Sequence, residues 1–229
     1  NGIIDGVVEL YYPNGNLAKI GTFNNGETNG IQKDFYENGI IKLEISHKNG
    51  KNNGMGKKYS TKGVLIGEFP FKNDELDGLV KQYNEVTGKL EIEANYKNGK
   101  TEGSLRAYYP NGKLESEEKY KNGLREGLTK SYYEDGSLEG ERFYKNNNLE
   151  GINKIYHPNG KLAKIAVFKN GELDGTVKTY YPNGKLDGIG TFKDGKMDGI
   201  QKEYYENGQI KMESLAKNDK KNGIARFYS

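Results

Sequence analysis

The sequence has no cysteine and only two histidines, His47 and His157. Without cysteine there is no disulfide framework, no thiolate metal site and no cysteine nucleophile. The two imidazoles lie in different parts of the chain, and neither a Gly-x-Ser-x-Gly elbow nor a Gly-Lys-Ser/Thr phosphate loop is present. These absences predict a protein that is not an enzyme and that has neither a cofactor nor a metal site.

Apolar residues are scarce as well: 33% of the chain is hydrophobic, and the mean hydropathy is -0.93. No apolar run approaches the ~18 residues of a membrane-spanning helix. Such values are typical of disordered chains, but the 18 tyrosines and 8 phenylalanines recur at fixed spacings, and 35 basic residues nearly balance 32 acidic ones. We therefore expect a folded protein. The composition selects no compartment, and cytoplasmic and secreted or cell-surface locations both stay open.

Glycine is abundant and periodic. It recurs every 24 residues, with one step of 25, at Gly6, Gly30, Gly54, Gly78, Gly103, Gly127, Gly151, Gly175, Gly199 and Gly223. A fixed period of this length indicates a repeat protein in which each unit packs on its neighbours. The sequence therefore predicts a single repeat array over residues 1–229, with both ends truncated within a unit.

Positions within a unit are numbered from its repeat glycine. In the one 25-residue unit, residues after the loop with the extra residue lie one place later and keep the position number of their counterparts. Position 5 is aromatic in all ten units, position 11 is always leucine or isoleucine, and position 17 is aromatic in seven of nine. Within each half of the unit, the apolar positions differ by even numbers, which is the period of a β-strand. The repeat glycine falls inside the longer strand, where glycine indicates a bulge.

Two turn motifs separate the predicted strands. Tyr-Pro-Asn-Gly predicts a three-residue loop, a type I turn followed by a left-handed glycine, with structural turn glycines at Gly112, Gly136, Gly160, Gly184 and Gly208. Lys-Asn-Gly is expected to form a three-residue loop too, which would place the aromatic residues of positions 5 and 17 on one face. A two-residue Asn-Gly turn is the alternative, and it would place them on opposite faces. Asp74, Asn147 and Asp219 replace the glycine of this turn, and both residue types tolerate positive φ. The predicted fold is all-β: an elongated, twisted, single-layer antiparallel meander of about ten hairpins.

Position 3 is basic in every unit but the first, where Glu9 stands. By strand alternation these cations share a face with the position 5 aromatics. The candidate binding residues are Lys81, Arg106, Lys130, Lys154, Lys178, Lys202, Tyr108, Tyr132, Tyr180 and Tyr204. An acidic protein or an anionic membrane surface would suit such a row, and the balanced net charge argues against nucleic acid. The simplest interpretation is structural, with each lysine stem covering a tyrosine ring.

A second tyrosine at position 6 points to the opposite face, at Tyr12, Tyr36, Tyr109, Tyr133, Tyr181 and Tyr205. Exposed tyrosines are favoured in protein contacts, but cross-strand packing that stiffens the sheet explains them equally well. The sequence leaves both interpretations open.

The full pattern is Gly-x-x-Lys-x-Tyr-Tyr-x-Asn-Gly-x-Leu, followed by Tyr/Phe-Lys-Asn-Gly-x-x-x-Gly. It resembles the MORN repeat, in the variant found in bacterial YwqK-type antitoxins. The resemblance implies an elongated β array that mediates binding, with toxin neutralisation as its role and no catalytic residues. MORN repeats elsewhere are linked to membrane attachment and accompany some phosphatidylinositol phosphate kinases, but this chain has no kinase segment.

Three functional hypotheses follow. The first is a non-catalytic scaffold for protein–protein interaction, with a toxin as its partner. The second is a secreted or surface-exposed bacterial adhesin that binds a host or cell-surface protein. The third is a scaffold that binds anionic membranes. Open strand edges would also allow end-to-end self-association.

Overall fold

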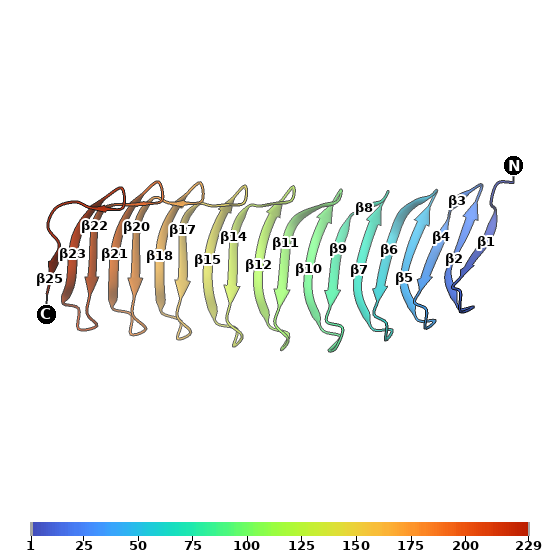
Figure 1. Ribbon diagram of the computed structural model, residues 1–229, viewed down its shortest axis with the longest axis horizontal. Helices are drawn as coiled ribbons and strands as arrows, with labels where there is room; N and C mark the ends of the chain where they lie inside the picture. Colours follow the sequence, from blue (N-terminus) through green and yellow to red (C-terminus); the bar gives the residue numbers. More distant parts are fainter. Residues whose placement is uncertain (1, 229) are drawn as a thin grey trace. The chain divides into compact units, whose positions relative to one another are not determined.

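A computed structural model describes residues 2–228 of the chain, so Asn1 and Ser229, the ends of the predicted array, lie outside the described residues. The chain divides into two compact units: unit 1 is Asn1–Gly112 with Lys121–Gly123, and unit 2 is Lys113–Tyr120 with Leu124–Ser229. Every regular element within residues 2–228 is a β-strand (Figure 1). That the whole of residues 1–229 forms one array stays a prediction.

Unit 1 is a run of antiparallel hairpins, drawn from blue to green in Figure 1. Its strands are β1 (Gly6–Tyr11), β2 (Leu17–Asn24), β3 (Glu27–Thr28), β4 (Gly30–Phe35), β5 (Ile41–Lys48), β6 (Lys51–Tyr59), β7 (Leu65–Lys72), β8 (Glu75–Leu76), β9 (Gly78–Tyr83), β10 (Leu90–Lys97) and β11 (Lys100–Tyr108).

Unit 2 repeats the same arrangement, from green to red in Figure 1. Its strands are β12 (Leu114–Lys121), β13 (Leu124–Arg125), β14 (Gly127–Tyr132), β15 (Leu138–Lys145), β16 (Asn148–Leu149), β17 (Gly151–Tyr156), β18 (Leu162–Lys169), β19 (Glu172–Leu173), β20 (Gly175–Tyr180), β21 (Leu186–Lys193), β22 (Lys196–Tyr204), β23 (Ile210–Lys217), β24 (Lys220–Lys221) and β25 (Arg226–Phe227). The all-β fold of antiparallel repeat hairpins is confirmed.

The Tyr-Pro-Asn-Gly motif forms the predicted three-residue loop. At Tyr181, the backbone N–H donates to the carbonyl of Lys185 (2.9 Å), and the N–H of Gly184 donates to the carbonyl of Tyr181 (2.8 Å). Gly184 has a φ of +90°, which is the left-handed conformation that closes such a loop. The loop pairs Tyr180 with Leu186 and places positions 5 and 11 on one face.

The Lys-Asn-Gly motif does not form the predicted three-residue loop. Lys169 pairs directly with Glu172, and the two residues between them, Asn170 and Gly171, have φ values of +52° and +89°. This is a two-residue type I′ turn, whose twist matches that of the strands. The prediction was wrong because asparagine itself adopts the left-handed conformation. As a result, the position 17 aromatics lie on the opposite face from those at position 5.

The repeat glycine absorbs a bulge, as its place inside a strand predicts. In unit 2, Phe168 pairs with Leu173, whereas three residues earlier Ile165 pairs with Lys178 and not with residue 176. Two extra residues are therefore accommodated in the stretch around Gly175, whose φ is +127°. Two extra residues preserve strand alternation, so every repeat presents the same side chains to the same face.

The two faces of each unit differ in character. We call the face that carries positions 3 and 5, such as Lys178 and Tyr180, the cation face. The opposite face, here called the glycine face, carries position 17 and several small residues. One of these is Gly190, which pairs with Val177. The few buried apolar side chains, Val80, Ala94, Ala166 and Val177, lie on the glycine face. On the cation face, most of the side chains at positions 3 and 5 are half-buried.

The position 6 tyrosines join consecutive repeats. The hydroxyl of Tyr36 donates to the carbonyl of Tyr59 (2.9 Å), and that of Tyr133 donates to the carbonyl of Tyr156 (2.6 Å). Where histidine replaces tyrosine, His157 Nε2 lies 2.8 Å from the carbonyl of Tyr180 and takes over the bond. Of the two interpretations left open by the sequence, these bonds support the stiffening role.

Candidate functional site

The structure places the predicted cations on the cation face. Each lies at the middle of its strand, across from position 14 of the neighbouring strands. Position 14 is a second row that the sequence reasoning missed. It is glutamate in six repeats, at Glu44, Glu68, Glu93, Glu117, Glu141 and Glu213, and isoleucine in the other three, at Ile20, Ile165 and Ile189. Counting fourteen residues from each repeat glycine finds the row, but only the strand register shows that it faces the cations.

The glutamates of this row accept from both cations and tyrosines. Lys33 Nζ lies 3.1 Å from Glu44 Oε1, and Tyr59 Oη donates to Glu44 Oε2 (3.0 Å). Burial alone would raise the pKa of Glu44, but the hydrogen bonds from Lys33 and Tyr59 outweigh it and lower the pKa of this carboxyl. The carboxylate is therefore held in its charged form.

The pKa of a tyrosine bonded to such a glutamate shifts in the opposite direction. Tyr83 Oη donates to Glu68 Oε2 (2.8 Å). Burial, followed by the hydrogen bond to the Glu68 carboxylate and its charge, raises the pKa of Tyr83 to about 12. The position 5 hydroxyls of such repeats are thus protonated hydrogen-bond donors at neutral pH.

The two units differ in the charge balance of these rows. Unit 1 has Lys33, Lys57, Lys81 and Arg106 in these rows with Glu9, Glu44, Glu68 and Glu93, so the charges of four cations and four carboxylates balance. Unit 2 sets Lys130, Lys154, Lys178, Lys202 and Arg226 against Glu117, Glu141 and Glu213, which leaves two positive charges in excess.

The excess charge is centred on Lys178. Lys178 pairs with Ile165 on one side and Ile189 on the other, so no carboxylate of the row faces it. Among the nine position 3 cations, Lys178 and Arg226 are exposed and the others are half-buried. Arg226 has Glu213 at 3.0 Å, whereas no ion pair within residues 2–228 involves Lys178.

Two tyrosine hydroxyls share this shortage of acceptors. In other repeats the position 5 hydroxyl donates to the glutamate of the preceding repeat, as Tyr156 does to Glu141 (3.2 Å). The corresponding residues for Tyr180 and Tyr204 are Ile165 and Ile189. Across the described part of the chain, neither of these two hydroxyls has a protein hydrogen-bond partner.

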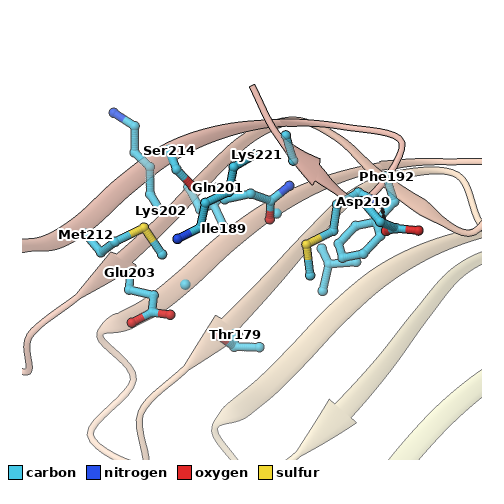
Figure 2. Close-up of a pocket in the computed structure, with 15 residues that line it drawn as sticks. Thr179, Ile189, Phe192, Gln201, Lys202, Glu203, Met212, Ser214, Asp219 and Lys221 are labelled. Atoms are coloured by element: carbon cyan, nitrogen blue, oxygen red, sulfur yellow. Dashed lines mark hydrogen bonds between the residues drawn. The ribbon is translucent and has the colours of Figure 1, made fainter. Parts of the chain in front are cut away.

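A hollow of about 400 Å³ on the glycine face of unit 2 is the second candidate site. Its lining includes Gly188 and Gly190 of β21 together with Phe192, Met197 and Met212, of which Figure 2 labels Phe192 and Met212. The Gln201 side chain covers Gly190, since a Cβ on Gly190 would lie 2.7 Å from its Oε1. The hollow can hold an apolar side chain, because methionine and phenylalanine provide an adaptable apolar lining.

Residues 2–228 contain neither a cluster of metal-ligating side chains nor a membrane-spanning helix. No group of three or more histidine, aspartate or glutamate side chains is placed to hold a metal ion in that range. No helix in the same range is long and apolar enough to cross a membrane.

Comparison with known protein families finds the MORN repeat variant eight times in the chain, over residues 4–25, 28–49, 76–98, 101–122, 125–146, 149–170, 173–194 and 197–218. Each matched segment begins two residues before a repeat glycine. The segment between 49 and 76 is unmatched, yet β6 and β7 form the same hairpin there. No match was found among curated proteins.

Proposed function

The chain belongs to the MORN repeat variant family, whose repeats are generally non-catalytic and associated with scaffolds that bind proteins or membranes, and on this premise we propose that it is a scaffold for a protein partner. The proposal includes the absence of catalysis in this chain. His47 and His157 lie in different units, and His157 is engaged in holding two repeats together.

The observation that carries this proposal is a row of exposed aliphatic side chains beside the cations. In unit 2, the side chains at position 1 include Ile152, which is 58% exposed, and Ile200, which is 49% exposed. Thr176 interrupts this row between them, and exposed aliphatic side chains gathered on one face mark interaction sites. Aliphatic contacts supply affinity, and the adjacent charges supply orientation and specificity.

The specific role that we propose is that of an antitoxin of the YwqK type, with a toxin as the partner. It is supported by the repeat variant, since the same pattern of turn and aromatic residues runs through most of the chain. The second candidate is an anionic-membrane scaffold, which the lysines beside exposed isoleucines favour. The glutamate row weighs against it, because it neutralises most of the cations that a membrane would need.

Affinity capture followed by reconstitution tests the proposal. The tagged chain would be incubated with extracts and with host-cell surface fractions, beside a matched control that carries Ile152→Ser and Ile200→Ser. The expected result is one protein that is lost from the control and that binds the pure chain at a fixed stoichiometry. A purified host surface protein that bound in this way would favour the adhesin instead. Saturable binding to anionic vesicles without any reconstituted protein partner would overturn the proposal.

A further inference from the structure

The glutamates of the cation face form a recurring three-donor site. Glu213 accepts from Arg226 Nη1 (3.0 Å) and Tyr228 Oη (3.0 Å), and it lies 3.4 Å from Lys202 Nζ. Glu141 has the same three neighbours, Lys130 (3.8 Å), Lys154 (3.9 Å) and Tyr156 (3.2 Å), so each of these two carboxylates is shared by the cation of its own hairpin and by the cation and tyrosine of the next.

Two successive repeats keep the donors of this site and lack the acceptor. Ile165 lies between Lys154 and Lys178, and Ile189 lies between Lys178 and Lys202. The tyrosines of the following repeats, Tyr180 and Tyr204, retain their hydroxyls.

Unit 1 provides a contrast to these two repeats. There isoleucine also replaces glutamate, at Ile20, but the aromatic residue of the next repeat is Phe35, so acceptor and hydroxyl donor are missing together. At Ile165 and Ile189, the donors Lys178, Tyr180 and Tyr204 remain without an acceptor among residues 2–228. Donors of this kind, set among aliphatic side chains, are suited to carboxylates from another molecule.

We propose that the cation face over β17–β22 is the docking surface for an acidic amphipathic helix of the protein partner, whose carboxylates occupy the places of the two missing glutamates. This inference rests on the proposed scaffold function and specifies its contact surface. Ile165 and Ile189 form the aliphatic floor, and Lys178 lies between the two carboxylates and binds both.

The spacing of the two places agrees with a helix that crosses the strands. Ile165 and Ile189 are equivalent positions one repeat apart, so they lie two strand spacings apart, or about 9–10 Å. Two turns of an α-helix rise by about 10.8 Å, so acidic residues at i and i+7 are suitably placed. Residues i+3 and i+4 lie on the same face of such a helix, so aliphatic side chains there would reach the surface between the two isoleucines.

The borders of the surface favour a protein segment over a membrane. Glu141 pairs with Lys154 on one side, and Glu213 lies beside Lys202 on the other. A membrane would extend its negative charge over both glutamates and be repelled by them. A single helix reaches only the cations between them.

The proposal is tested with the full chain and a labelled helical peptide that has glutamates at i and i+7 and leucines between them. A second peptide with glutamines in place of the glutamates is the ligand control. In the chain, the double substitution Ile165→Glu and Ile189→Glu restores the repeat's own acceptors, and Ile20→Glu is the matched control outside the surface. Thermal unfolding verifies that both variants fold.

The expected result is that the acidic peptide binds the native chain and the Ile20→Glu variant alike. Its dissociation constant should rise roughly tenfold or more for the double variant and for the glutamine peptide, as expected when a charge-assisted contact is lost. Equal affinity of the double variant and the native chain would overturn the inference. The inference would also be overturned if the native chain bound phosphatidylserine vesicles and not the peptide, and if the double substitution abolished this vesicle binding.

The outcome is separable from that of the scaffold proposal. If the partner recovered by affinity capture still binds the double variant with native affinity, the scaffold function stands and this docking surface is wrong. If no protein partner can be reconstituted at all, the scaffold proposal itself fails.

Discussion

Removing the hydroxyl of Tyr133 tests how consecutive repeats are held together. Tyr133 Oη donates to the carbonyl of Tyr156, 23 residues later, over 2.6 Å. The Tyr133→Phe substitution keeps the ring and removes only this bond between half-buried groups. A neutral hydrogen bond of this kind contributes about 0.5–1.5 kcal/mol net. For a chain of this length, a loss of that size lowers the melting temperature by roughly 2–4 °C per kcal/mol.

The control is Tyr180→Phe in the same unit. The Tyr180 hydroxyl, also on a half-buried residue, has no partner among the described residues, so its removal should change the free energy of unfolding by less than about 0.5 kcal/mol. Urea unfolding of both variants, followed by circular dichroism, measures the difference. Equal destabilisation by the two substitutions would refute the reasoning, since ring packing and not the hydroxyl bond would then join the repeats.

Substitutions at three further positions probe the turns, the glycine face and the tyrosine–glutamate pairs. Asn147→Ala should lower the free energy of unfolding in urea by roughly 1–3 kcal/mol, because Asn147 combines a φ of +68° with a side-chain hydrogen bond. Asn147→Gly should lower it less, and the reverse order of the two variants would contradict this explanation. Gly190→Ala should cost about 1–3 kcal/mol in the same assay, because the new Cβ would lie 2.8 Å from Phe192 Cε2, and an unchanged stability would show that the ring moves freely. Tyr83 has its folded pKa raised from 10.0 to about 12, so the stability it contributes is present below pH 10 and is lost as the pH rises toward 12; Glu68→Gln should lower this pKa, measured by tyrosinate absorbance, and an unchanged titration would rule out the carboxylate as a cause.

The hairpins could be predicted because their signals are local. Proline, asparagine and glycine specify the loop around Gly184, and even spacing specifies strands on either side of it. The Asn170–Gly171 turn could not be decided in the same way. Its type determines which face receives Phe168, and in a sheet with two exposed faces no strong hydrophobic contrast selects one.

The candidate site was predicted only in part. Strand alternation correctly put Lys178 and Tyr180 on one face. The glutamate row escaped notice because acidic residues occur at many positions, and only the register of neighbouring strands shows that Glu141 faces Lys154. The exceptional place of Lys178 then follows from Ile165 and Ile189, which are unremarkable in the sequence alone.

The most direct test of the account is lysine labelling of the chain with and without its reconstituted partner, read by mass spectrometry. If a partner docks on the cation face of unit 2, Lys178 should be strongly protected in the complex. Lys57 and Lys81, which face glutamates in unit 1, should label as before. Protection of Lys221 beside the glycine-face hollow, with Lys178 unchanged, would contradict the account and place the binding surface on the opposite face.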